Sequence, residues 1–143
     1  GTTRAMLARI GATIDAATRP RDLSEGQRLA LALAVVLAGR PGLVLLDEPT
    51  RGLDYPAKRR LVAVLRDLAA DGHTVVLATH DVELAAEAAD RVMVLATGEV
   101  VADGPAREVL AGSPAFAPQV AKILHPVAAL TVADVTAALE PAS

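Results

Sequence analysis

Two short segments of the chain carry the residue types that chemistry on a phosphate needs. Ser24, Gly26 and Gln27 open a helical pattern, and Asp47-Glu48 follows an apolar run. A hydroxyl, a glycine and unpaired N–H groups at a helix N-terminus can hold an anion. Carboxylates at the end of a buried strand can hold Mg²⁺ through its water shell and can orient an attacking water. We therefore expect these two segments to act on a phosphorylated ligand.

Each segment also has a purely structural interpretation. Ser24-x-x-Gln27 is a capping box, which is common where helices begin. Asp47-Glu48 can simply end the strand and solvate its end. Pro49 and Thr50 make this second interpretation less favourable, because they complete a longer pattern with the two carboxylates.

Asp54 and His80 are weaker candidates on their own. Asp54 lies just before Pro56, where an aspartate is by default a helix N-cap residue. His80 follows the apolar run 74–78, at the same end of its strand as Asp47-Glu48. A lone histidine is more often structural, but at this edge it could donate a hydrogen bond to a γ-phosphate.

Alternating helices and strands must position these residues. The strand–helix–strand order predicts right-handed crossovers and a mostly parallel sheet flanked by helices. We expect the helix that Ser24 opens to be apolar nearly all round and therefore buried, and the strand 43–46 to be covered on both faces. The predicted helices are 4–18, 24–37, 56–70, 81–89, 105–110, 116–124 and 131–139, and the predicted strands are 43–46, 74–78 and 92–95, with a hairpin into 99–101.

Composition supports a packed α/β domain and disfavours several functions. Of the 143 residues, 52% are hydrophobic and 22% charged, which provides enough apolar surface for a core. One Tyr, one Phe and no Trp argue against a surface that stacks bases, and a net charge of −3 argues against a DNA-binding face. The chain contains no Cys, and charged residues interrupt every apolar run before it could span a bilayer. Gly1 begins the chain without a leader pattern or an initiator Met, from which we expect a fragment without a secretion signal.

In this order and spacing, residues 22–104 resemble the C-terminal two-thirds of an ABC transporter ATPase subunit. The resemblance implies ATP and Mg²⁺ as ligands, and a head-to-tail dimer in which each signature loop closes over ATP held by the other ATPase domain. It also assigns roles: the signature loop to Leu23, Ser24, Glu25, Gly26 and Gln27, the Mg²⁺-binding aspartate to Asp47, the catalytic glutamate to Glu48, the D-loop to 52–54 with Asp54 at the nucleotide, and the catalytic switch histidine to His80.

Two further segments, 50–55 and 116–121, resemble the energy-coupling-factor (cobalt/vitamin-type) importers. This narrower resemblance implies a second ABC ATPase domain, as a homodimer or heterodimer, and a transmembrane coupling subunit as partners. It places the protein peripherally on the cytoplasmic face of the cell membrane, and no nucleic acid is expected to bind.

The chain departs from the family pattern in two places. Signature loops usually have glycine at the third position, where this chain has Glu25, and no Gly-x-x-x-x-Gly-Lys-Ser/Thr loop precedes Ser24. We therefore expect a partial P-loop NTPase (RecA-like) core that lacks its Walker A half. Its parts would be the end of a helical subdomain (1–22), the C-terminal portion of the ATPase domain (23–111) and a small helical appendage (112–143).

A missing phosphate loop has physical consequences. Its strand would belong to the same sheet as 43–47, so its loss should leave apolar sheet surface and an open strand edge exposed. We expect the isolated chain to be inactive in ATP hydrolysis.

Two alternative functions stay open at this point. One is the C-terminal head lobe of a chromosome-maintenance or repair ATPase, in which a coiled coil separates the signature from the phosphate loop. No heptad run precedes Ser24, which disfavours it. The other is a non-catalytic interaction module that uses only its signature face.

Overall fold

The computed structural model describes residues 7–8, 12–112, 117–124 and 129–139. The chain divides into two compact units, Gly1–Thr79 and His80–Ser143. Each unit is described by itself below.

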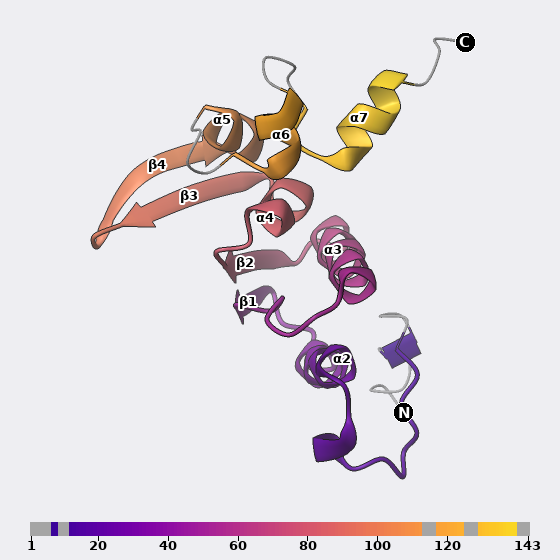
Figure 1. Ribbon diagram of the computed structural model, residues 1–143. Coiled ribbons are helices and arrows are strands. Elements are labelled where there is room, and N and C mark those ends of the chain that lie inside the picture. The colour runs from indigo at the N-terminus through magenta and orange to yellow at the C-terminus, as the bar shows by residue number, and fades with distance from the viewer. Residues whose placement is uncertain (1–6, 9–11, 113–116, 125–128, 140–143) are drawn as a thin grey trace. The chain divides into compact units, whose positions relative to one another are not determined.

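The first unit contains a parallel strand pair and two long helices (Figure 1). Strands β1 and β2 pair in parallel, from Leu43 opposite Thr74 to Asp47 opposite Ala78. Apart from the predicted helix 4–18, the helices and strands of this unit follow the predicted pattern, with ends that shift by at most one residue. In chain order the elements are the 3₁₀ helix η1 (Pro20–Asp22), α2 (Glu25–Leu37), β1 (Leu43–Asp47), α3 (Tyr55–Ala70) and β2 (Thr74–Ala78).

Apolar side chains of α2, β1 and α3 form the core of this unit. Leucines recur on α3 at helical spacing and are all buried, which fits one apolar face on an otherwise charged helix. Val44 supplies the buried side chain of β1. The buried residues of the two helices are Ala30, Leu33, Ala34 and Leu37 on α2, and Leu61, Val64, Leu65 and Leu68 on α3.

The prediction that strand 43–46 is covered on both faces is wrong. Leu43 is 52% exposed, Leu45 69% and Val76 51%, so one face of the β1–β2 pair is apolar and open within the described part of the chain. Val35 and Val36 of α2 are also more than half exposed, so that helix is buried on one side and not all round. These exposed side chains confirm the expected apolar sheet surface. In a larger sheet, an apolar strand such as 43–46 would be buried on both faces.

The predicted helix over 4–18 also does not extend as expected. Residues 12–19 form a turn and irregular backbone, while 1–6 and 9–11 lie outside the described residues. The Asp15 carboxylate accepts a hydrogen bond from the Ala17 N–H at 3.0 Å, and its carbonyl accepts one from the Thr18 N–H at 2.9 Å. These local hydrogen bonds offer the backbone an alternative to the helix ladder.

Within its described residues, the second unit contains a hairpin and four helices, two of which fall in the predicted C-terminal appendage. β3 and β4 pair antiparallel, with an irregularity between Val94 and Leu95. The described strands therefore form two separate two-stranded sheets, one parallel and one antiparallel. The elements are α4 (Val82–Ala88), β3 (Arg91–Ala96), β4 (Glu99–Pro105), α5 (Ala106–Ala111), α6 (Gln119–Leu124) and α7 (Val132–Leu139).

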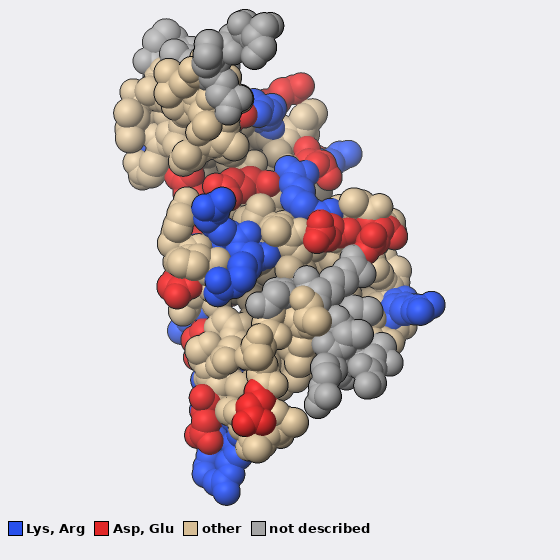
Figure 2. Space-filling view, turned by 90° about the vertical axis from the view of Figure 1, so that its right-hand side faces the viewer, with Lys and Arg blue, Asp and Glu red and all other residues tan. Residues whose placement is uncertain are grey.

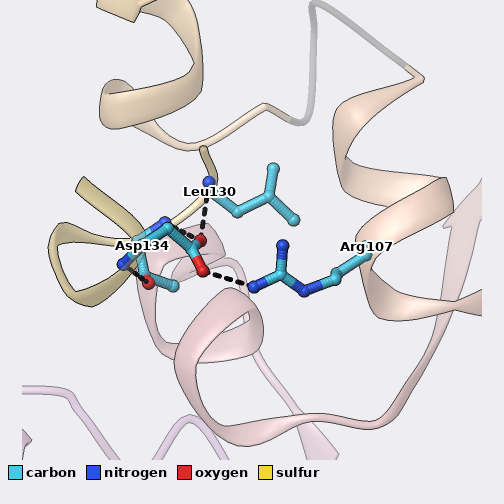
Figure 3. A network of polar contacts seen from close by, with 4 residues as sticks. Arg107, Leu130 and Asp134 are labelled. Carbon is cyan, nitrogen blue, oxygen red and sulfur yellow. Dashed lines mark hydrogen bonds and ion pairs between the residues drawn. The ribbon is translucent and has the colours of Figure 1, made fainter. Parts of the chain in front are cut away.

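Polar contacts and a small apolar cluster hold the last helices to this unit. Ala106, Leu110 and Leu130 are buried together. The Gln119 N–H donates to the Glu83 carboxylate at 2.7 Å, which fixes the start of α6 to α4. Arg107 of α5 donates to the Asp134 carboxylate of α7 (Figure 3).

Among the described residues, no helix has both the length and the apolar character that a membrane span needs. On the face shown in Figure 2, acidic and basic side chains occur beside one another.

Candidate functional site

Ser24 and Gln27 form the predicted capping box at the start of α2. Ser24 Oγ accepts from the Gln27 N–H at 3.2 Å, and Gln27 Oε1 accepts from the Ser24 N–H at 3.0 Å. The box satisfies two of the N–H groups that a helix start leaves unpaired. The structural interpretation of these two residues is therefore confirmed, and any ligand role must come from what surrounds them.

A groove of about 600 Å³ opens beside this helix start. The capping box and Gly26 line it together with residues of the loop before α3 and of α3 itself. Gly26 contributes no side chain, so backbone is accessible at the point where a phosphate would meet the helix dipole. The polar residues that line the groove are Thr13, Ser24, Glu25, Gln27, Asp54 and Arg60, and the apolar ones include Leu29, Leu33, Leu53, Leu61 and Val64.

The Glu25 carboxylate forms an ion pair with Arg28, three residues further along α2. The carboxylate lies 3.2 Å from Arg28 Nη1, and Arg28 Nη2 donates to the Leu23 carbonyl at 3.0 Å. Leu23 itself is buried. Arg28, which the sequence alone did not single out, therefore ties the first and third residues of the predicted signature loop together and compensates the charge of Glu25.

Asp47 and Glu48 lie at the carboxyl end of β1, as predicted. Glu48 has a φ of 45°, which a residue other than glycine seldom adopts. The Glu48 N–H donates to the Ala78 carbonyl at 2.8 Å and so holds this conformation against β2. Backbone strain of this kind costs roughly 1–3 kcal/mol and clusters at functional sites.

Thr79 is a residue of this edge that sequence reasoning missed. Its hydroxyl lies 3.4 Å from Glu48 Oε2 and donates to it. The usable signal was a polar residue directly after strand 74–78, which pairs with β1. The contact orients the Glu48 carboxylate from the neighbouring strand.

Asp54 has the structural role that its position predicted. Its Oδ1 accepts from the Ala57 N–H at 2.8 Å and caps α3. Asp54 also lines the groove, as Ser24 does. Its contact with a nucleotide stays a prediction.

The structure thus separates the candidate residues into two groups in the first unit. Asp54 joins Ser24, Glu25, Gly26 and Gln27 around the groove, whereas Asp47 and Glu48 are not among the groove's lining residues. His80 is exposed and is the first residue of the second unit, so its role stays a prediction.

Comparisons with known proteins show what the chain as a whole is similar to. The family model described as "AAA domain, putative AbiEii toxin, Type IV TA system" matches residues 10–86. A putative ABC transporter ATP-binding protein of Streptomyces avermitilis is 68% identical over 97% of this chain and 25% of its own length. The cobalt import ATP-binding protein CbiO of Rhodobacter capsulatus is 51% identical over 62% of this chain and 31% of its own length.

Solved structures show the same likeness. The dimeric post-hydrolysis structure of the ATP-binding cassette MJ0796, bound to ADP and Pi, superposes with a TM-score of 0.64 at 32% identity. It covers 72% of this chain, which corresponds to 45% of that one. The chain spans about a quarter of the length of the Streptomyces relative, so its activity as part of a whole protein is a matter for proposal.

Proposed function

Because the chain belongs to the ATP-binding cassette (ABC) ATPase family, we propose that it serves as the signature-bearing part of an ATP-hydrolysing subunit in an import system of the energy-coupling-factor type. The transported substrate does not enter the proposal, since transport specificity in such systems lies in membrane subunits.

The observation that carries the proposal is the separation of the candidate residues into two groups. The groove by Ser24 and Gly26 offers a hydroxyl, backbone and a helix N-terminus. The β1 edge offers the Asp47 and Glu48 carboxylates. Neither group alone makes a complete phosphoryl-transfer site, which needs phosphate binding, a metal ligand and a group that orients water. We infer that each group completes a different nucleotide site.

The residues at the β1 edge fit a bound Mg²⁺–ATP. Asp47 is exposed at the strand end and can hold Mg²⁺ through its water shell. Bound Mg²⁺ would neutralise charge on the phosphates. Glu48, oriented by Thr79, would accept a proton from the attacking water, and His80 would donate to the γ-phosphate. Asp47 ends β1, and Glu48 and Thr79 directly follow β1 and β2, at the strand ends where open α/β sheets bind ligands.

The groove residues would serve a nucleotide that another ATPase domain holds. Ser24 Oγ and the N–H groups near Gly26 would donate to its γ-phosphate, favoured by the helix dipole. The dimeric MJ0796 structure with bound ADP and Pi supports a second ATPase domain as partner.

The narrower assignment rests on likeness to one kind of importer. CbiO of Rhodobacter capsulatus is described as a cobalt import ATP-binding protein. By that likeness we propose a transmembrane coupling subunit as a further partner and a peripheral position at the cytoplasmic face of the membrane. The exposed apolar face with Leu43, Leu45 and Val76 would be covered by the phosphate-loop part of the same ATPase.

The test compares Glu48→Gln with the unchanged protein, expressed from the complete open reading frame that encodes this chain. We expect ATP turnover to fall at least a hundredfold, while ATP binding is retained, because the amide cannot accept the proton. Glu99→Gln makes the same chemical change at an exposed hairpin position and should leave turnover unchanged. Unchanged turnover in Glu48→Gln would contradict the catalytic role of Glu48, whereas an unchanged protein without ATP turnover would favour a non-catalytic interaction module.

A second measurement tests the isolated chain. Titration calorimetry of residues 1–143 with Mg–ATP should show no tight one-to-one binding, because the chain lacks the phosphate loop pattern. Tight binding would show that the two groups suffice for a nucleotide and would overturn the two-site proposal.

A further inference from the structure

Glu25 packs against Gly52, which lies in the loop before α3 and also lines the groove. A Cβ placed on Gly52 would lie only 3.0 Å from Glu25 Cγ and 3.7 Å from its Cβ. Gly52 also has a φ of 76°, which L side chains rarely adopt. The aliphatic stem of Glu25 therefore lies directly over the backbone of the loop before α3.

Arg28 keeps the Glu25 side chain in this place. It holds the carboxylate at 3.2 Å and the Leu23 carbonyl at 3.0 Å. Both side chains of the ion pair are about half exposed, so the pair contributes little stability. Its effect is geometric, because it draws the negative charge toward Arg28 and leaves the stem against Gly52.

The loop under Glu25 is internally bonded and leads to the β1 edge. The Leu53 N–H donates to the Thr50 carbonyl at 3.1 Å, and the Arg51 N–H donates to the Glu48 carbonyl at 3.1 Å. Thr50 is buried. Because these turns are closed by hydrogen bonds, a displacement at Gly52 would reach the backbone of Glu48.

We propose that Glu25 is a positioning residue, whose stem braces Gly52 and so couples the signature loop to the placement of Glu48. The inference rests on the proposed function, since Glu48 must act on a bound nucleotide for its placement to matter. A nucleotide of the second ATPase domain that engages Ser24 and Gly26 would thereby also set the geometry of this chain's own catalytic carboxylate. Signature loops usually have glycine at this position. Glycine has no side-chain stem, so it would not couple the signature loop to Glu48 in this way.

A double-mutant cycle tests the brace in the product of the complete open reading frame. Gly52→Ala should lower kcat for ATP about tenfold, with KM within twofold, because the new Cβ displaces the loop. Glu25→Gly should lower kcat several-fold, and Glu25→Gln, which keeps the stem, should restore most of that loss. In the Glu25→Gly background, Gly52→Ala should cost at most threefold, because the opposing stem is gone.

Gly72→Ala is the matched control for backbone strain. Gly72 has a φ of 88°, and the described residues place no atom within 4 Å of a Cβ built there. This variant should lose thermal stability as Gly52→Ala does but keep kcat. If Gly52→Ala fails to fold, the difference in kcat between Glu25→Gly and Glu25→Gln still tests whether the Glu25 stem acts as a brace.

Three outcomes would overturn the inference or its premise. Additive kcat effects in the cycle, or equal losses in Glu25→Gly and Glu25→Gln, would overturn the brace while leaving the proposed function intact. An unchanged protein without ATP turnover would overturn the proposed function, and the brace with it.

Discussion

Two helices of this molecule begin with the same pair of reciprocal hydrogen bonds. At α2 the pair joins Ser24 and Gln27. At α7, Thr131 Oγ1 accepts from the Asp134 N–H at 3.2 Å, and Asp134 Oδ2 accepts from the Thr131 N–H at 2.9 Å. Both are capping boxes in the local sense, so the motif alone does not distinguish a ligand site from a helix start.

The surroundings of the two boxes differ. At α7 the carboxylate of Asp134 completes the box, and its other oxygen, Oδ1, accepts a hydrogen bond from Arg107 (Figure 3). Partial burial disfavours the charged form, but hydrogen bonds from the Leu130 and Thr131 N–H groups and from Arg107 outweigh it and lower the pKa of Asp134 to about 2. At α2 the closing group is the neutral amide of Gln27, Gly26 precedes it, and a groove lies alongside. An anion site at a helix start needs a neutral capping group and room for the ligand beside it.

The largest effect should come from filling the space at α2. A Cβ on Gly26 would lie 3.5 Å from the Ala57 Cβ, an ordinary contact, so Gly26→Ala should change the free energy of unfolding by less than about 0.5 kcal/mol. ATP turnover of the full-length protein should nevertheless fall about a hundredfold, or roughly 2.7 kcal/mol, because the methyl group would block a phosphate. Steady-state kinetics and thermal unfolding measure the two effects. A stable variant with normal turnover would show that the groove by α2 is no more a ligand site than the start of α7.

Removing the hydroxyl of the α2 box should have the next largest effect. Ser24→Ala loses the cap, at a cost of about 1 kcal/mol of stability. It also loses a hydrogen bond to a charged phosphate oxygen, worth about 1.5–3 kcal/mol, so turnover should fall about tenfold or more. Denaturant unfolding and kinetics of one preparation separate the two losses. If turnover falls only as far as the folded fraction does, the two boxes are equivalent and Ser24 is structural.

The sequence predicted the local features of α2 well, because they depend on neighbouring residues. The Ser24–Gln27 box, the Asp54 cap and the ends of α3 follow from spacing and from Pro56. The order of the strands and the bounds of β1 and β2 followed from apolar runs bounded by glycine and charged residues, whereas β4 extends to Pro105, beyond the predicted 99–101.

The remaining features depend on contacts between distant segments. Nothing local to Glu25 indicates that its stem lies on Gly52, and nothing local to Thr79 indicates its hydrogen bond to Glu48. The burial of strand 43–46 was predicted wrongly for the same reason. An apolar run is typical of a covered strand, but whether a cover exists is decided outside the run.

A smaller effect is expected at the box of α7. Thr131→Ala removes the acceptor of the Asp134 N–H and should cost about 1 kcal/mol of stability. Turnover of the full-length protein should stay unchanged, in contrast with Ser24→Ala. Hydrogen exchange of the α7 amides, read beside kinetics, checks both. A drop in turnover that exceeds the loss of folded protein would mean that the α7 box also has a functional role, and the contrast would fail.

The smallest effect concerns the charge at the α7 box and depends on pH. Asp134 has its pKa lowered from the ordinary 3.8 to about 2, so its charged form stabilises the fold. That contribution is fully present above the unfolded pKa and is lost as the pH falls from about 4 to about 2. Asp134→Asn should therefore cost about 0.5–1 kcal/mol at pH 7, a figure reduced for solvent screening, and the difference from the unchanged chain should vanish near pH 2. Denaturant unfolding of both chains from pH 7 to pH 2 measures it. Equal pH dependence in the two chains would show that the charge of Asp134 contributes nothing to stability, so that the α7 box would work equally well with a neutral amide, as the α2 box does.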